Sequence, residues 1–185
     1  MRLFVAIDLE EDIRARLVGY MDGVRGFAPE ARWVAPESLH VTLKFIGHSE
    51  KLEEIKAALQ KISGSATQVS LSGTGFFPTP KAARVFWVGI NAGEHLALLA
   101  AKIDDALVPL GVEREKRAYT PHLTLARGGD GKKSRDAGFR KLQEKLQRAE
   151  PPNFGTMTAR EFFLYESKTA PSGAVYTKLA RFALA

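Results

Sequence analysis

The chain has 185 residues, no cysteine and a net charge of +6. Its composition, 45% hydrophobic and 26% charged, is typical of a globular protein. The missing cysteines exclude disulfide scaffolds, thiol nucleophiles, iron–sulfur clusters and thiolate zinc sites. No apolar run reaches the roughly 18 residues that a membrane span needs, and Asp8 comes too early for a signal peptide. We therefore expect one domain over residues 1–185, cytoplasmic and without contact to a membrane.

Hydrophobic periodicity predicts strands and helices in alternation along the chain. Strands are expected over 2–8, 31–35, 40–46, 67–77, 84–90, 119–127, 155–166 and 174–184. Helices are expected over 10–24, 50–62 and 91–108, and a basic helix should end near residue 148. Asp8 with Glu11, and Asn91 with Glu94, have the spacing of capping boxes at the starts of the first and third helices.

The positive charge is concentrated in residues 132–148, which hold seven basic and two acidic residues. The basic residues are Lys132, Lys133, Arg135, Arg140, Lys141, Lys145 and Arg148. Such a strip favours an anionic partner, of which nucleic acid is the commonest. A solvated helix face is the alternative for a charge run taken alone.

The chain contains an internal repeat. A shift of 82 residues lays Arg2-Leu3-Phe4 on Arg84-Val85-Phe86 and His40-Val41-Thr42-Leu43 on His122-Leu123-Thr124-Leu125. Strand–helix–strand therefore occurs twice, and each copy ends in His-x-Thr-Leu. Two related halves usually pack about a pseudo-two-fold axis, which would bring the equivalent strands face to face.

Strand geometry explains the spacing of the first motif. Successive side chains of a strand alternate between its two faces. His40 and Thr42 should therefore share one face, while Val41 and Leu43 share the other with Phe45. The apolar face is expected to be buried, which leaves an imidazole and a hydroxyl on an open face.

The second motif has the same alternation, with His122 and Thr124 on the open face. Arg127 is a candidate phosphate ligand, but strict alternation places it on the face away from His122. It reaches the site only if the strand ends or bulges there, as Gly128-Gly129 allows.

Two imidazoles and two hydroxyls on facing strands suit phosphodiester cleavage. One histidine can take a proton from water while the other gives a proton to a leaving oxygen. The hydroxyls of Thr42 and Thr124 can bind non-bridging phosphate oxygens. Neither motif has a third ligand of the kind that zinc enzymes show, so no metal or other cofactor is expected. The residues alone leave open which of His40 and His122 is the acid.

With these motifs the sequence resembles the two-histidine phosphoesterase superfamily, and within it the RNA 2′,3′-cyclic phosphodiesterases, also called 2′-5′ RNA ligases. Both His-x-Thr-Leu motifs match the paired signature of that superfamily. Further matches are Arg2-Leu3-Phe4-Val5-Ala6-Ile7, Phe45-Ile46-Gly47, Gly75-Phe76-Phe77-Pro78, Pro121, Arg127, Leu164-Tyr165-Glu166-Ser167, Gly173 and Tyr176. The resemblance covers nearly the whole chain.

The resemblance implies a bilobal α+β fold, in which two antiparallel sheets face each other across a central cleft with helices outside. It implies hydrolysis of an RNA 2′,3′-cyclic phosphate to a 2′-phosphate. His40 would be the proton donor and His122 the proton acceptor, while Thr42, Thr124 and Arg127 would hold the phosphate. The reverse reaction would form a 2′-5′ linkage. The expected partners are RNA ends that carry a 2′,3′-cyclic phosphate, tRNA-derived ends among them. The protein itself is expected to be a monomer.

Two alternatives remain open. The same site could act on 2′-5′ oligonucleotides or on the cyclic phosphate of an ADP-ribose derivative, which a panel of cyclic nucleotides would distinguish. A non-catalytic RNA-binding module would use the basic strip instead. It predicts RNA affinity without turnover, and it leaves both histidine motifs unexplained.

Overall fold

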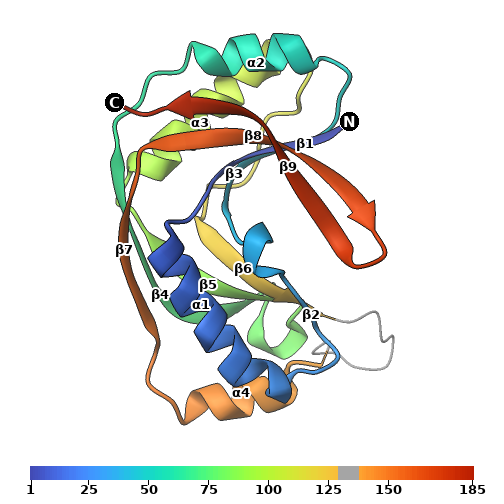
Figure 1. The fold of residues 1–185 in the computed structure, drawn as a ribbon, viewed down its shortest axis with the longest axis vertical. Helices are drawn as coiled ribbons and strands as arrows, with labels where there is room; N and C mark the ends of the chain where they lie inside the picture. Colours follow the sequence, from blue (N-terminus) through green and yellow to red (C-terminus); the bar gives the residue numbers. More distant parts are fainter. Residues whose placement is uncertain (129–137) are drawn as a thin grey trace.

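The computed structural model describes residues 1–128 and 138–185. It contains two antiparallel sheets with helices packed beside them (Figure 1). The first sheet has the strand order β3-β1-β8-β9, and the second sheet has the order β2-β6-β5-β4-β7. The expected α+β class with two antiparallel sheets is confirmed.

The elements of the described residues follow the predicted order. The strands are β1 (Arg2–Ile7), β2 (Arg32–Trp33), β3 (Val41–His48), β4 (Thr67–Phe77), β5 (Val85–Asn91), β6 (His122–Arg127), β7 (Asn153–Ala159), β8 (Glu161–Ala170) and β9 (Gly173–Ala183). The α-helices are α1 (Glu11–Val24), α2 (Leu52–Gln60), α3 (His95–Leu107) and α4 (Arg140–Gln147). No helix within these described ranges combines the length and the apolar character that a membrane crossing requires.

The strands that the repeat equates occupy equivalent places. β1 pairs with β3 in the first sheet, and β5 pairs with β6 in the second. β1 also pairs with β8 from the end of the chain, so that Leu3 lies between Gly47 and Glu166. β5 pairs in the same way with β4. Each histidine motif is therefore carried next to the central strand of its own half.

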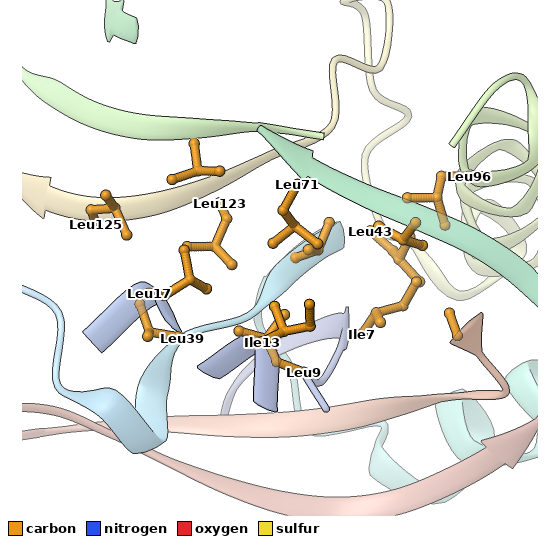
Figure 2. Close-up of a cluster of buried hydrophobic side chains, with 14 of the residues drawn as sticks. Ile7, Leu9, Ile13, Leu17, Leu39, Leu43, Leu71, Leu96, Leu123 and Leu125 are labelled. Carbon is orange, nitrogen blue, oxygen red and sulfur yellow. The ribbon is translucent and has the colours of Figure 1, made fainter. Parts of the chain in front are cut away.

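The helices connect the two sheets. α1 follows β1 of the first sheet but packs against β7 of the second, and α3 follows β5 of the second sheet but packs against β3 of the first. Ile13, Leu17 and Met21 of α1 are fully buried. Figure 2 shows Ile13 and Leu17 beside Leu39, the leucine that precedes His40. Fully burying one such side chain stabilises the fold by about 1.5–3 kcal/mol. The same apolar core includes the buried residues of both motif strands and therefore supports both motifs.

The prediction of capping boxes at the starts of α1 and α3 was wrong. The N-cap of α1 is Glu10, whose side chain makes no capping hydrogen bond, and the N-cap of α3 is Glu94, which makes none either. Asp8 instead accepts hydrogen bonds from the Leu9 amide and from Arg14. Asn91 accepts from the Gly93 amide. Local spacing predicted the start of α1 to within one residue, but α3 begins only at His95, because Asn91 still belongs to β5.

The prediction of one continuous strand over residues 155–166 was also wrong. The chain forms β7 up to Ala159 and β8 from Glu161, and the two strands belong to different sheets. Ala159 pairs with Thr67 of β4, whereas Glu161 pairs with Ala183 of β9. Periodicity cannot report such a change, because the β-type pattern continues through Arg160.

Gly75 of β4 gives space to an aromatic ring. A Cβ atom at Gly75 would lie 2.1 Å from the Trp87 ring, and Trp87 is the cross-strand neighbour of Thr124. We expect Gly75→Ala to destabilise the protein by about 1–3 kcal/mol, the usual cost of overpacking. The measurement is the free energy of unfolding in urea.

Gly19→Ala is the matched control for that substitution. Gly19 lies exposed within α1, and no atom would come within 4 Å of its new Cβ. Alanine there should stabilise the helix by about 0.5–1 kcal/mol. A Gly75→Ala protein as stable as the wild type would show that the Trp87 ring is free to move.

Candidate active site

A β-bulge in β3 changes the face of the sheet to which the side chains after Leu43 point. The register pairs Ala6 with Thr42 and Val5 with Lys44, so Leu43 is an extra residue. Because of this bulge, Leu43 and Lys44 are both buried, and the Phe45 side chain is 54% exposed. The expectation that Phe45 lies on the buried face was therefore wrong. Its ring has the Arg2 guanidinium 5.3 Å from its centre.

An equivalent bulge in β6 changes the face of the sheet to which the Arg127 side chain points. Phe86 pairs with Ala126 and Trp87 with Thr124, which leaves Leu125 as the extra residue. Leu125 and Ala126 are both buried, and Arg127 is exposed. The bulge reverses the alternation, so Arg127 shares a face with Thr124. This is the condition under which the sequence allowed Arg127 to reach the site.

His40 is held at both of its ring nitrogens. Nδ1 lies 2.7 Å from the Ser38 carbonyl oxygen, and Nε2 lies 3.0 Å from the Thr42 hydroxyl. The ring packs against Phe4, at 4.9 Å between centroids, and edge-on against Tyr176 at 5.3 Å. The pair His40 and Thr42 therefore does lie on one face, as the spacing predicted.

His122 repeats part of this arrangement. Its Nδ1 lies 3.0 Å from the Thr120 carbonyl oxygen, and its ring stands edge-on to Phe77 at 5.0 Å. A carbonyl only accepts hydrogen bonds, so Nδ1 carries the proton in each neutral ring. Both histidines thus have Nε2 as the nitrogen that is able to take a proton.

Electrostatic interactions connect the two motifs. Burial lowers the pKa of His40 most, and the positive charges of Arg127 and His122 lower it further. The hydrogen bond to Ser38 and the negative charge of Asp8 act in the opposite direction. The fold therefore brings His40, His122 and Arg127 within electrostatic reach of one another, and β3 contacts β6 directly.

Tyr119 joins the two motif segments by a hydrogen bond. Its hydroxyl donates to the Thr42 carbonyl oxygen over 2.8 Å, and burial raises its pKa. Tyr119 lies three residues before His122, so the segment that leads into the second motif is attached to the first. Sequence reasoning missed this contact, because nothing local in the sequence relates Tyr119 to Thr42.

The remaining predicted residues are placed as follows. Thr124 is half-buried beside Trp87. Lys132, Lys133 and Arg135 lie outside the described residues, whereas the end of the basic strip forms α4. In the ranges 1–128 and 138–185, no group of three or more His, Cys, Asp or Glu residues could hold a metal ion.

The family model of the 2′-5′ RNA ligase superfamily matches residues 11–170, which include both histidine motifs. This chain belongs to that superfamily. An RNA 2′,3′-cyclic phosphodiesterase of Methanothermobacter thermautotrophicus is 33% identical over 188 residues, covering 100% of this chain and 99% of the relative. One of Archaeoglobus fulgidus is 32% identical, covering 98% and 99% of the two chains.

Solved structures of the superfamily share the fold. The TT0787 protein of Thermus thermophilus superposes with a TM-score of 0.81 at 29% identity, covering 100% of this chain and 98% of that one. LigT of E. coli, solved in complex with 3′-AMP, gives a TM-score of 0.79 at 29% identity, covering 99% and 97%. This superfamily member therefore matches these relatives and structures over 98–100% of its length.

Proposed function

We propose that this superfamily member hydrolyses RNA 2′,3′-cyclic phosphodiesters to 2′-phosphomonoesters. The observation that carries the proposal is the matched pair of imidazoles, each with Nδ1 on a backbone carbonyl and Nε2 as its reactive nitrogen. The names of the M. thermautotrophicus and A. fulgidus relatives support the substrate class.

The proposed reaction needs one proton acceptor and one proton donor. His122 Nε2 takes a proton from water, whose oxygen attacks phosphorus. The bond between phosphorus and the 3′ oxygen breaks, and protonated His40 gives its Nε2 proton to that oxygen. The product keeps the phosphate on the 2′ oxygen. The assignment of donor and acceptor follows the family resemblance, since Nδ1 binds a backbone carbonyl in both rings and leaves Nε2 as the reactive nitrogen of each.

Three further residues are proposed to bind the phosphate. The Thr42 hydroxyl lies 3.0 Å from His40 Nε2, so an oxygen bound to it would be next to the donor nitrogen. Thr124 would bind from the facing strand. The Arg127 guanidinium would stabilise the charge that develops on the non-bridging oxygens.

Ligation would use the same groups, with another nucleophile in place of water. An RNA 5′-hydroxyl would replace water and give its proton to His122, and its oxygen would attack phosphorus. The bond between phosphorus and the 3′ oxygen would break, His40 would protonate that oxygen, and a 2′-5′ linkage would remain. We propose 2′-5′ ligation as a second outcome of this site, which RNA with a cyclic phosphate and a 5′-hydroxyl would reveal as a longer product.

The decisive assay is incubation with a 2′,3′-cyclic nucleotide and identification of the product. We expect a 2′-phosphate. A 3′-phosphate would contradict the roles of the two histidines. A panel with 2′-5′ oligonucleotides and an ADP-ribose cyclic phosphate distinguishes the alternative substrates. RNA affinity without any turnover would favour a binding module.

Activity is expected to be independent of metal ions, because neither motif offers a third protein ligand. The protein should keep its rate of cyclic nucleotide hydrolysis after dialysis against a chelator. Loss of the rate, with recovery on addition of zinc or magnesium, would contradict the mechanism.

The pH dependence follows from the environment of His40. The reaction needs protonated His40, so kcat/KM should fall on the alkaline side as His40 loses its proton. Burial lowers the pKa of His40, which places this fall at lower pH than for an exposed histidine. A bound phosphate favours the protonated ring, so the alkaline fall of kcat should lie at higher pH than that of kcat/KM.

The two histidines interact, so the apparent pKa values of the profile belong to the pair. The measurement is the rate against pH for a cyclic mononucleotide at constant ionic strength. A rate that rises steadily to about pH 10, where lysine titrates, would show that hydroxide or a lysine is the base.

A further inference from the structure

The turn before His40 is held by an arginine from α1. Residues Pro36–Ser38 form a short 3-10 helix, and the Ser38 carbonyl accepts from His40 Nδ1. Arg14 donates to the Pro36 carbonyl over 2.6 Å and to the Leu39 carbonyl over 3.4 Å. The Arg14 side chain is only 11% exposed. One guanidinium thus binds backbone oxygens on both sides of Ser38.

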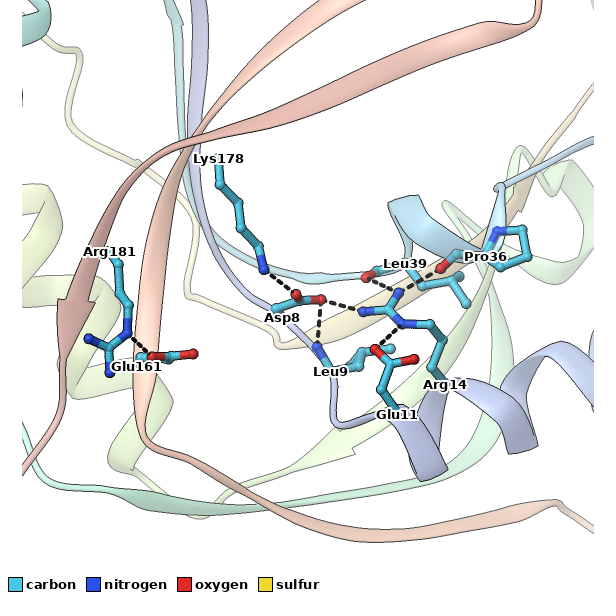
Figure 3. Close-up of polar contacts among 9 residues, drawn as sticks. All are labelled: Asp8, Leu9, Glu11, Arg14, Pro36, Leu39, Glu161, Lys178 and Arg181. Carbon is cyan, nitrogen blue, oxygen red and sulfur yellow. Dashed lines mark hydrogen bonds and ion pairs between the residues drawn. The ribbon is translucent and has the colours of Figure 1, made fainter.

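Asp8 fixes that guanidinium from the other side. Figure 3 shows the Asp8 carboxylate between Arg14 and Lys178, with the Arg14 fork reaching on to Pro36 and Leu39. Asp8 also accepts from Lys178 over 2.6 Å and from the Leu9 amide over 2.8 Å. Burial opposes ionisation of Asp8, but these bonds and the charge of Arg14 hold its pKa below the ordinary value.

We propose that Asp8 and Arg14, neither of which contacts the reacting atoms, are positioning residues that hold the 36–39 turn so that the Ser38 carbonyl orients His40. The inference rests on the proposed function, in which His40 donates the proton. It adds that this donor is aligned from α1 and the end of β1. Lysine cannot replace Arg14 fully, because a single ammonium lacks the planar fork that reaches a carboxylate and two carbonyls together.

Asp8 has a second effect through its charge. The titratable and charged groups around the His40 ring are Asp8 directly after β1, Arg127 and His122 of β6, and Tyr165 and Tyr176, whose rings contact the imidazole. Asp8 is the carboxylate among them, and its negative charge raises the pKa of His40 against the lowering by burial, Arg127 and His122. Asp8→Asn should therefore lower the pKa of His40 further.

The test compares Arg14→Gln and Arg14→Lys with Arg16→Gln. Arg16 lies on the same helix and also donates to a backbone carbonyl, that of Phe154, but it does not reach the 36–39 turn. One readout is kcat and KM for a 2′,3′-cyclic nucleotide. The other is the tautomer of His40, read from the nitrogen-15 shifts of its ring and assigned with a His40→Gln protein.

We expect Arg14→Gln to lower kcat by up to about 100-fold, the scale of a misplacement near 1 Å, with KM nearly unchanged. Arg14→Lys should lose less, and Arg16→Gln should match the wild type. The wild-type His40 ring should carry its proton on Nδ1 when neutral, and Arg14→Gln should show a mixture of tautomers. If Arg14→Gln does not fold, Arg14→Lys and Asp8→Asn supply the same readouts.

A wild-type kcat together with a wild-type tautomer in the Arg14 variants would overturn the proposal. An equal loss of kcat in Arg16→Gln would also overturn it, because the effect would then be general to α1. A failure of the proposed function can be distinguished from a failure of this inference. If the wild type hydrolyses no cyclic nucleotide, the tautomer measurement still decides whether Arg14 orients His40.

Discussion

Replacing His40 or His122 by alanine should lower kcat/KM by at least about 10²–10⁴-fold, the usual contribution of one general acid or base. His40→Ala removes the proton for the 3′ oxygen, and His122→Ala removes the acceptor of the water proton. The double variant should lose far less than the product of the two single losses, because the two residues act as a unit. The measurement is steady-state hydrolysis of a cyclic mononucleotide.

His95→Ala is the control for both substitutions. His95 is exposed at the first residue of α3 and belongs to neither histidine motif. It should hydrolyse the substrate at the wild-type rate. Comparable losses for His95→Ala and His40→Ala would mean that the site has been placed wrongly.

The second large effect is expected for Arg127→Gln. Removing one preorganised donor to developing negative charge typically costs about 10²–10³-fold in kcat. The substitution should also change the pH profile. The Arg127 cation lowers the pKa of His40, so its removal raises that pKa and moves the alkaline fall in rate to higher pH.

Arg148→Gln serves as the matched control, because Arg148 is an exposed arginine at the end of α4. It should keep both the rate and the pH profile for a mononucleotide. A lower kcat in Arg127→Gln without any shift of the profile would indicate that Arg127 binds substrate but lies too far from His40 to act on its charge.

Much of the fold was predictable because its signals are local. Strand alternation and helical periodicity depend on residues a few positions apart, and they located the strand that follows His40 directly and the strand that begins at His122. The repeat added information over a longer range, since it equated β1 and β3 with β5 and β6. The same shift of 82 residues also lays Phe45 on Arg127. This equivalence was a signal that both residues follow a bulge and point to the same face of their strands.

What the sequence could not supply depends on contacts between distant segments. Strict alternation failed at Phe45 because the bulge at Leu43 is a property of the pairing with β1. The tautomers of both histidines depend on backbone carbonyls at Ser38 and Thr120. The bonds of Arg14 to the 36–39 turn arise only when α1 packs beside that turn.

The position of β1 has a consequence for synthesis on the ribosome. β1 is translated well before β8, which is one of its two neighbours in the first sheet. Until then β1 has an open hydrogen-bonding edge, and Phe4 lacks the stacked ring of Tyr165. Pairing across so long a stretch of chain makes folding slow and exposes strand edges to aggregation. The nascent chain therefore depends on β8 to protect β1, and a product that ends before β8 would be prone to aggregate.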